Sequence, residues 1–314
     1  MITSAHLVLS CTNRKHAPPG VYPRLRDVGG RDVETRAAAW IETVAAAEPR
    51  MPARELYAGE YWTTALALAD ECRRHMTTEV WVISAGLGLV RIDDRVPAYA
   101  ATLATGHPDS VARGSEGRGA RETWWHRIST WDGPSSASGP RRLADLDVSG
   151  GSTVIVCAGR TYVDAVAADL AALRARISGD RLLLLSSGEA PANLEDPWLS
   201  VPGQLRMRFG GSMSSTSTRA CREAVRRLAP AGDLRALAVR GLLNEWVQDS
   251  AQLPLYDRKR LSDDDIKRWI ERDVVSNSGA ANKTASLRRL RESGAACEQA
   301  RFGRLFEFVM EASE

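Results

Sequence analysis

Four short apolar segments, each followed by small or polar residues, constrain the fold of this 314-residue chain most strongly. They cover residues 6–9, 80–83, 153–157 and 182–185, and segments with the apolar spacing of helices separate them. Short apolar runs of this kind are typical of strands buried on both faces, and their alternation with helices is typical of a parallel sheet. We therefore predict an α/β fold in which a doubly wound parallel sheet is flanked by helices.

The loops that follow the four predicted strands are candidates for a common site. Right-handed crossovers place the carboxyl ends of parallel strands, and hence these loops, on one edge of the sheet. Ligands of open α/β proteins bind just outside that edge. The first loop holds Ser10, Cys11, Asn13 and Lys15, and its hydroxyl, amide and cationic groups suit a phosphate, a sugar or the edge of a base. The other loops cover residues 84–99, 159–162 and 186–189.

The stretch 79–103 carries the strongest signal for the centre of that site. Its predicted strand ends in small residues that include Gly86 and Gly88, which let the backbone turn sharply and approach a ligand closely. Asp93, Asp94 and Tyr99 follow. A strand that ends in glycines, carboxylates and a tyrosine indicates an active site. The alternative is an ordinary connection whose Asp residues cap the next helix.

Two further segments have an unusual composition. Residues 106–151 are rich in Gly and Pro around Trp124, Trp125 and Trp131, and we expect loops with a short helix at 121–130. The tryptophans are candidates for a stacking or wedge surface on nucleic acid, or else for anchors that hold this insertion to the core. Residues 210–219 place Gly, Ser and Thr before a predicted helix, which suits either an anion-binding helix N-terminus or a linker with a serine N-cap.

Arginine clusters indicate a surface for a polyanion. The net charge is only +3, yet residues 204–228 hold six Arg against Glu223 alone, and a second cluster lies in residues 282–304. Helical patterns dominate after residue 230, so we expect an α/β domain at 1–230 and a helical, DNA-binding domain at 231–314. Solvated helix faces are the alternative for either cluster. The residues predicted to bind DNA are Arg160, Arg208, Ser212, Ser214, Arg219, Arg288, Arg289 and Arg291.

Several classes of protein and site are disfavoured. Five scattered cysteines and five histidines lack the spacing of a metal site or a disulfide framework, so we expect neither a metal nor another cofactor, and a reducing cytoplasm. No apolar run reaches the roughly 18 residues of a membrane span, and the N-terminus lacks the pattern of a signal peptide. We therefore expect a cytoplasmic protein that needs neither a membrane nor an obligate protein partner.

Three short motifs resemble a bacterial family. They are Ser10-Cys11-x-x-x-Lys15, Glu55-Leu56-Tyr57, and Ser84-Ala85-x-x-Gly88-Leu89 followed by Asp94 and Pro97-x-Tyr99. Over residues 1–105 the chain is similar to the YaaA peroxide-stress proteins and to the uracil-DNA-glycosylase-like part of archaeosine synthases, although Gly86-Leu87 departs from a bulkier polar pair. The resemblance implies a glycosylase-like sheet and nucleobase chemistry, and it extends to anti-phage DNA glycosylases that remove glucosylated hydroxymethylcytosine.

These observations lead to three hypotheses. The first is a DNA N-glycosylase, active in phage defence, that flips a modified base of double-stranded DNA into a catalytic α/β domain and leaves an abasic site. A carboxylate would stabilise positive charge on the sugar; Asp94 is the first candidate and Asp93 the second, while Tyr99 would hold or protonate the leaving base. The alternatives are a DNA- or nucleotide-binding stress protein without enzymatic activity, and a nucleoside hydrolase or base transglycosylase. The residues predicted to bind the base or sugar are Ser10, Cys11, Asn13, Lys15, Tyr57, Ser84, Gly86, Gly88 and Glu189.

Overall fold

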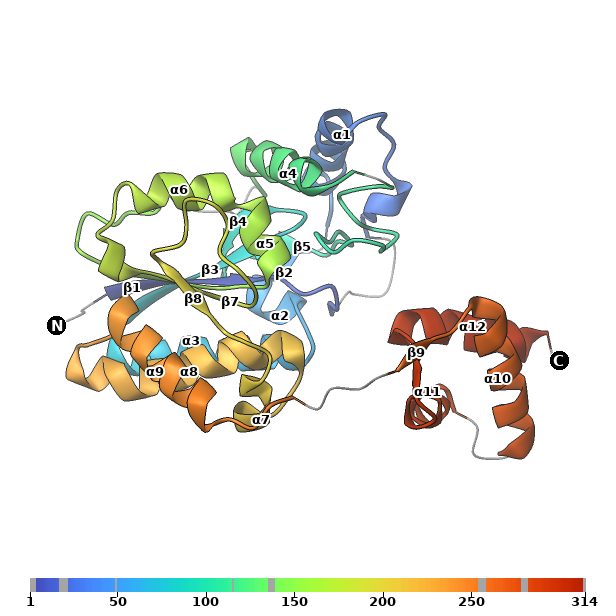
Figure 1. Ribbon diagram of the computed structural model, residues 1–314. Coiled ribbons are helices and arrows are strands. Elements are labelled where there is room, and N and C mark those ends of the chain that lie inside the picture. The colour runs from blue at the N-terminus through green and yellow to red at the C-terminus, as the bar shows by residue number, and fades with distance from the viewer. Residues whose placement is uncertain are drawn as a thin grey trace. The chain divides into compact units, whose positions relative to one another are not determined.

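A computed structural model describes residues 4–16, 22–48, 50–114, 116–134, 139–253, 258–277 and 282–312 (Figure 1). The chain forms two compact units, which cover Met1–Gln252 and Leu253–Glu314. The first is an α/β unit and the second is helical.

The first unit is built around a mostly parallel sheet, as the sequence predicts. In the described part of the chain its strand order is β4-β3-β1-β6-β7-β8. β4 (Gly88–Arg91) runs antiparallel to β3, and the other strands run parallel to their neighbours. These are β1 (Ser4–Ser10), β3 (Thr77–Ser84), β6 (Thr153–Cys157), β7 (Leu182–Ser186) and β8 (Trp198–Ser200).

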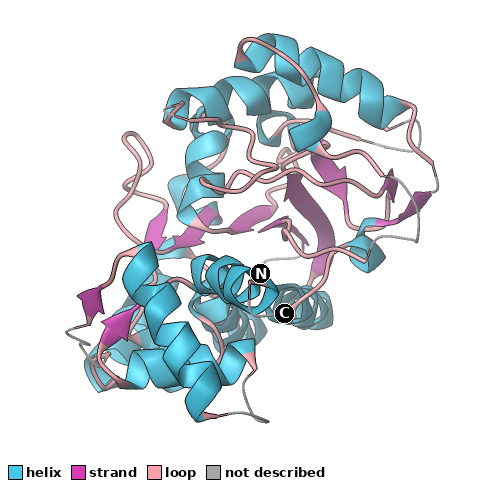
Figure 2. Ribbon diagram, turned by 90° about the vertical axis from the view of Figure 1, so that its right-hand side faces the viewer, coloured by secondary structure: helices cyan, strands magenta, loops and turns pink. Residues whose placement is uncertain are grey.

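Helices cover both faces of this sheet, so Leu7, Ile155 and Leu184 of the central strands have no exposed surface that water can reach (Figures 1 and 2). α1 (Val33–Ala45), α4 (Arg118–Thr130), α5 (Arg160–Ala165) and α6 (Ala167–Arg174) lie on one face. α3 (Glu60–His75), α8 (Thr216–Leu228) and α9 (Ala236–Asp249) lie on the other. The remaining short elements are α2 (Ala53–Leu56), α7 (Leu205–Phe209) and the antiparallel pair β2 (Arg50–Pro52) and β5 (Arg95–Pro97).

The hairpin formed by β3 and β4 determines the path of residues 84–99. The chain turns after β3 and returns along it as β4, with Ser84 opposite Gly88. Gly88 has a φ of 77°, a conformation that favours glycine. Because β4 runs back along β3, the next residues lie beside the middle of β3: the backbone N–H of Ile92 donates to the carbonyl of Val80 at 3.0 Å. This loop therefore does not stay at the carboxyl edge of the sheet.

The order in which strands join the sheet changes direction between β1 and β6, although these two strands are parallel. β1 pairs with β3 on one side and with β6 on the other, so the connections that leave these two strands diverge. In open α/β sheets such a switch point leaves a crevice at the carboxyl ends of the strands. Here that crevice lies beyond Ser10 and Cys157.

The second unit contains α10 (Asp263–Ser276), α11 (Lys283–Glu292), α12 (Gln299–Glu311) and the two-residue strands β9 (Lys259–Arg260) and β10 (Ala295–Ala296). Its core includes Ile266, Ile270, Leu290 and Phe302. The division after Gln252 lies beyond the expected boundary at residue 230, because α9 belongs to the first unit: its Trp246 is fully buried in the core of that unit.

Candidate functional site

A cleft of about 560 Å³ opens at the β1–β6 switch point. This volume is in the range of small-ligand pockets, roughly 300–1,000 Å³. The loops after β1, β6 and β7 meet there, as predicted from the strand ends, whereas the loop at 84–99 does not line the cleft. The first turn of α3 and the segment that leads into α8 line it as well. The lining residues are 10–13, 58–61, 102, 104, 158, 159, 162, 187, 212–214, 217 and 218.

Tyr61 joins the two strands that diverge at the switch point. Its hydroxyl accepts hydrogen bonds from the backbone N–H of Ser10 at 3.2 Å and from the Ser10 hydroxyl at 2.8 Å. It donates to the carbonyl of Cys157 at 3.2 Å. Burial raises the pKa of Tyr61, so this hydroxyl keeps its proton at neutral pH. The Tyr61 hydroxyl thus bridges the carboxyl ends of β1 and β6, just beyond the last residues that pair.

Cys11 and Tyr162 form an adjacent part of the lining. The Tyr162 hydroxyl lies 3.3 Å from the sulfur of Cys11, and burial raises the pKa of Tyr162. Asn13, which also lines the cleft, is exposed, and its amide nitrogen lies 3.0 Å from Nε2 of His107. The first predicted loop therefore does contribute Ser10, Cys11 and Asn13 to the cleft.

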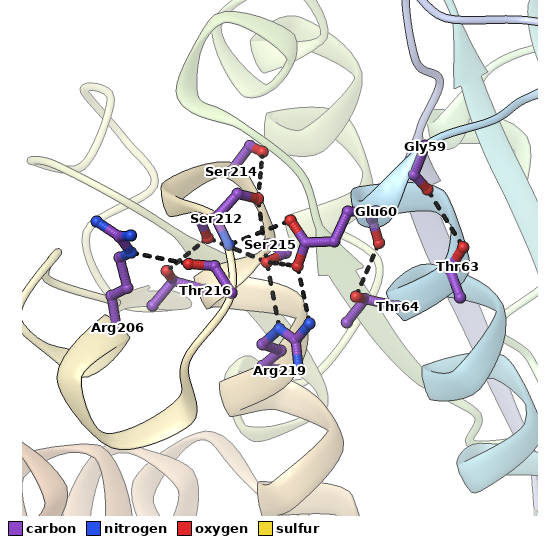
Figure 3. A network of polar contacts seen from close by, with 11 residues as sticks. Gly59, Glu60, Thr63, Thr64, Arg206, Ser212, Ser214, Ser215, Thr216 and Arg219 are labelled. Atoms are coloured by element: carbon purple, nitrogen blue, oxygen red, sulfur yellow. Dashed lines mark hydrogen bonds and ion pairs between the residues drawn. The ribbon is translucent and has the colours of Figure 1, made fainter. Parts of the chain in front are cut away.

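Glu60 begins α3 and carries the one acidic side chain among the described lining residues (Figure 3). Its carboxylate accepts hydrogen bonds from the backbone N–H of Ser212 at 3.1 Å, the hydroxyl of Ser215 at 2.7 Å and Nη2 of Arg219 at 2.8 Å. Hydrogen bonds from Ser212, then Arg219 and Ser215, lower the pKa of Glu60 to about 2 although burial opposes the shift. The carboxylate is therefore ionised at any pH near neutrality.

The segment 210–219 forms a wall of the cleft through Ser212, Ser214 and Ser217. Gly210 and Gly211 have φ values of 68° and 74°, which let the chain turn into the short 3-10 segment Met213–Ser215 before α8. The predicted residue Arg219 is engaged by Glu60 (Figure 3) and by the hydroxyl of Ser215 at 3.3 Å. The segment is thus an ordered wall held by Glu60.

A buried cluster of Lys15, Tyr57, Ser84 and Tyr99 adjoins the cleft. The Tyr99 hydroxyl lies 2.7 Å from the Ser84 hydroxyl and 3.1 Å from that of Tyr57. Nζ of Lys15 lies 4.3 Å from the centroid of the Tyr99 ring and 5.8 Å from that of Tyr57. The cluster contacts the cleft through chain neighbours, since Asn13 and Ala58 line it. The sequence thus selected four residues that the fold does bring together, but behind the cleft rather than on its surface.

The two glycines of the first hairpin serve packing. A Cβ on Gly86 would lie 2.6 Å from ring atoms of Tyr99 and 3.1 Å from Trp40. The carbonyl of Gly86 accepts a hydrogen bond from Nε1 of Trp40 at 2.8 Å. A Cβ on Gly88 would lie 2.8 Å from the carbonyl oxygen of Ile128. Both glycines therefore allow a close approach to the backbone, as expected. The approaching atoms belong to the protein itself and not to a ligand.

Asp93 and Asp94, the candidate catalytic acids, lie outside the cleft lining. Asp94 is buried in the turn after β4, where its Oδ2 accepts from the backbone N–H of Arg91 at 2.8 Å. Asp93 is 64 % exposed and pairs with Nη2 of Arg54 at 2.8 Å. The hairpin causes this displacement, because it carries both residues away from the carboxyl edge of the sheet. In the structure both residues lie in the connection from β4 to β5, and neither caps a described helix as the alternative had expected.

The other predicted residues of the first unit do not line the cleft. Arg160 pairs with Asp164 at 2.9 Å and donates to the carbonyl of Glu189, whose side chain is exposed. The guanidinium of Arg208 lies 5.8 Å from the Trp246 ring centroid. Both arginines are therefore held by neighbouring groups at the protein surface.

The tryptophans of the insertion 106–151 are anchors. Nε1 of Trp124 donates to the carbonyl of Ala85 at 2.7 Å, and Nε1 of Trp125 donates to Asp169 at 3.0 Å. Both rings are buried. Trp131 is half-buried, with the Arg141 guanidinium 5.8 Å from its ring centroid. Buried indoles with satisfied N–H groups do not form a wedge surface.

In the second unit, the three predicted arginines have different roles. Arg289 makes a bidentate pair with the buried carboxylate of Asp273, with both N–O distances at 2.6 Å. Arg291 donates to the carbonyl of Cys297 at 3.0 Å. Arg288 is 72 % exposed and lies 3.7 Å from Glu292. A groove of about 1100 Å³ between α11 and α12 is lined by five cations and three carboxylates: Arg258, Lys283, Arg288, Arg291, Arg304, Glu292, Glu298 and Glu307.

Glu60 and Tyr61 were not among the site residues selected from the sequence, whereas Tyr162 lies in the loop 159–162 that was expected at the site. A signal was present for Glu60 and Tyr61, because Gly59 comes immediately before the helix whose first turn carries them. Their proximity to residues 212–218 was not readable, since more than 150 residues separate Glu60 from Ser212.

Among the described residues, no group of three or more His, Cys, Asp and Glu is arranged to hold a metal ion, and no helix has the length and apolar character needed to cross a membrane. No family model, curated protein or solved structure matches the chain.

Proposed function

We propose that the chain is a DNA N-glycosylase whose cleft at the β1–β6 switch point receives a modified base with its deoxyribose. The observation that supports it best is the combination of this cleft with Glu60, its one acidic side chain among the described lining residues. Hydrolysis of an N-glycosidic bond builds positive charge on the sugar, and a nearby carboxylate stabilises that charge. Glu60 takes the role that the sequence suggested for Asp94.

The contacts of Glu60 suit an electrostatic role better than a proton-transfer role. A pKa of about 2 keeps the group ionised, so it is a poor general acid and a weak base at neutral pH. Ser212, Ser215 and Arg219 hold the carboxylate in one position. Arg219 also neutralises part of its charge, which limits the field at the sugar. In this proposal, Glu60 supplies a fixed negative charge at the cleft.

The aromatic lining suits a flat base. Tyr61 and Tyr162 are half-buried and keep their phenolic protons, so each offers a ring surface and a polar hydroxyl. Ser10 and Asn13 offer hydroxyl and amide groups for hydrogen bonds to base edges.

Two surfaces suit the DNA backbone. In the first unit, Ser212 and Ser214 place hydroxyls in the wall of the cleft, and hydroxyls of this kind contact phosphates in protein–DNA complexes. In the second unit, Arg288 and Arg304 are exposed in the groove between α11 and α12. Exposed arginines contribute a salt-dependent term to DNA affinity. Arg289 is excluded from that role because Asp273 engages it.

The test uses purified full-length protein and duplex oligonucleotides that carry glucosylated hydroxymethylcytosine, hydroxymethylcytosine, uracil or no modification. Abasic sites are measured as strand breaks after mild alkali. We expect abasic sites on a modified duplex, and at least a tenfold lower rate for Glu60→Gln, since one stabilising interaction with the transition state is typically worth more than about 1.4 kcal/mol. Glu122→Gln is the matched control, because that carboxylate is exposed to a similar degree, 41 % against 43 %, and pairs with Arg118 outside the cleft.

The same assay separates the competing functions. Salt-sensitive DNA binding without abasic sites on any duplex would support a binding protein and reject the glycosylase. Release of bases from free nucleosides, with no action on duplexes, would support a nucleoside hydrolase. Normal excision by Glu60→Gln would reject the role of this carboxylate.

A further inference from the structure

The side chain of Lys15 ends in an environment that is unusual for a lysine. The residue as a whole is half-buried, but its Nζ is fully buried, and no described group accepts a hydrogen bond from it. The amine instead lies against the ring faces of Tyr99 and Tyr57. The hydroxyls of these tyrosines and of Ser84 are occupied with one another. No described protein group therefore competes with a ligand of the cleft for this amine.

Within the described part of the chain, no carboxylate makes a hydrogen bond to this amine. Asp109 acts on it electrostatically, yet that carboxylate is already engaged by Nε of Arg26 at 2.9 Å and by the Arg26 backbone N–H at 3.1 Å. Burial lowers the pKa of Lys15. A lower pKa increases the neutral fraction of the amine, and the neutral amine is the nucleophilic form.

Lys15 adjoins the cleft on two sides. Its own loop lines the cleft at Cys11 and Asn13, and the thiol of Cys11 lies close enough to act on the amine. Its backbone forms an antiparallel bridge with Tyr57, which immediately precedes the lining residues 58–61. Because Cys11 lines the cleft and Lys15 does not, the amine has to turn from the Tyr99 ring towards Cys11 to reach a ligand there.

We infer that the amine of Lys15 forms a Schiff base with the aldehyde of an open-chain abasic deoxyribose held in the cleft, which gives the protein a lyase activity at abasic sites. The inference rests on the proposed function, because the abasic sugar is the product of base excision. Nζ attacks C1′, and loss of the aldehyde oxygen as water, with one proton taken up from solvent, leaves a protonated imine. Removal of a C2′ proton to solvent drives β-elimination, which breaks the C3′–O bond and frees the 5′-phosphate end of the downstream strand. Hydrolysis of the imine then restores the lysine.

The aromatic faces suit the charged intermediate. A protonated imine at Nζ carries a positive charge that the ring faces of Tyr99 and Tyr57 attract. The same rings shield the amine from water, since Nζ is buried against them. Lys15 is thereby a catalytic residue with a role separate from that of Glu60.

The small number of lysines in the sequence makes the modified residue easy to identify. Lys15 is the only lysine of the first unit, and the other three, Lys259, Lys267 and Lys283, belong to the second. Full-length protein is incubated at pH 7 with a duplex that carries a preformed abasic site, and sodium cyanoborohydride reduces any imine to a stable amine. A covalent protein–DNA adduct is read on a denaturing gel, and peptide mapping identifies the modified residue.

We expect an adduct on Lys15, at least a tenfold loss in Lys15→Met, and normal yield in Lys267→Met, because Lys267 pairs with Asp264 and does not line the groove between α11 and α12. Mapping of the unaltered protein gives the answer even if Lys15→Met fails to fold. No adduct, or an adduct on the N-terminal amine or on a lysine of the second unit, would overturn the inference. Because the abasic site is preformed, the two proposals fail separately: excision without an adduct rejects only the lyase, and an adduct without excision of any modified base rejects only the glycosylase.

Discussion

Nη2 of Arg219 lies 2.8 Å from Oε1 of Glu60, and this pair ties the first turn of α8 to the first residue of α3 beside the cleft. Two segments that are far apart in the chain thereby form one wall of the candidate site. The pair also sets the ionisation of the carboxylate on which the proposed chemistry depends.

Arg219→Met should raise the pKa of Glu60 from about 2 towards its ordinary value of 4.5, because it removes one of the hydrogen bonds that lower it. The folded-state pKa is depressed, so the contribution of Glu60 to stability is complete above about pH 4.5 and is lost as the pH falls towards 2. The variant should lose less stability than the parent over that window. An NMR titration of the Glu60 carboxyl carbon measures the shift directly. Arg226→Met, which removes an exposed partner of Glu223, should leave the Glu60 titration unchanged.

Tyr61→Phe should destabilise the first unit by about 1–3 kcal/mol, because buried polar groups of Ser10 and Cys157 lose their partner. Urea unfolding followed by circular dichroism measures the change. Tyr22→Phe is the control, since the half-buried Tyr22 ring stacks near the exposed Arg24 guanidinium, 5.1 Å from its centroid, and Phe keeps that ring. Equal stability of the two variants would show that Tyr61 does not hold β1 and β6 at the switch point.

Asp94→Asn should lower the stability of the first unit and leave the rate of base excision nearly unchanged. The carboxylate accepts a hydrogen bond from the backbone N–H of Arg91. Weakening this hydrogen bond should lower the free energy of unfolding by about 1 kcal/mol. Base excision by the folded variant should stay within a factor of about two or three of the parent. A hundredfold loss of excision in a fully folded Asp94→Asn would return the catalytic role to Asp94 and remove it from Glu60.

Gly86→Ala should destabilise the first unit by about 1–3 kcal/mol, because a Cβ there would lie 2.6 Å from the Tyr99 ring, which is itself buried. Gly241→Ala is the opposite case. Gly241 lies within α9, and among the described residues no neighbouring atom lies within 4 Å of the position that its Cβ would take, so alanine should stabilise the helix by up to about 1 kcal/mol. Thermal unfolding of both variants tests the pair, and a loss of stability in both would point to a general intolerance of change in this unit.

Arg289→Met and Arg288→Met should separate stability from DNA binding in the second unit. Loss of Arg289 leaves the buried carboxylate of Asp273 without its bidentate partner and should cost about 3–5 kcal/mol. Loss of Arg288 should leave stability within about 0.5 kcal/mol, as for most surface changes. In salt-titrated DNA binding, Arg288→Met should lower the magnitude of the salt slope by about one. An unchanged slope would exclude contact between Arg288 and phosphate.

Apolar runs predicted the sheet well because burial on both faces demands a continuous apolar strand, and the chain supplies this at 80–83, 153–157 and 182–185. The same reasoning missed the direction of β4. Residues 88–91 are as apolar as a strand or a buried loop, and only the pairing of Ser84 with Gly88 shows that the chain turns back. That turn moved Asp93 and Asp94 away from the carboxyl edge, so the expectation that every strand-end residue would lie at one edge was wrong for them.

By itself, the sequence determined the α/β class, the helices on both faces, the helical C-terminal unit and the presence of Ser10, Cys11 and Asn13 at a strand end, since each follows from local apolar periodicity. Tertiary structure alone decided that Glu60 pairs with Arg219 and that Arg289 pairs with Asp273. It also decided that the amine of Lys15 is buried against the rings of Tyr57 and Tyr99. Contacts between distant segments depend on how the elements pack in three dimensions, and no local pattern encodes them. For the same reason, the hydrogen bonds of Glu60 and the burial of the Lys15 amine, on which the two proposals rest, became visible only in the fold.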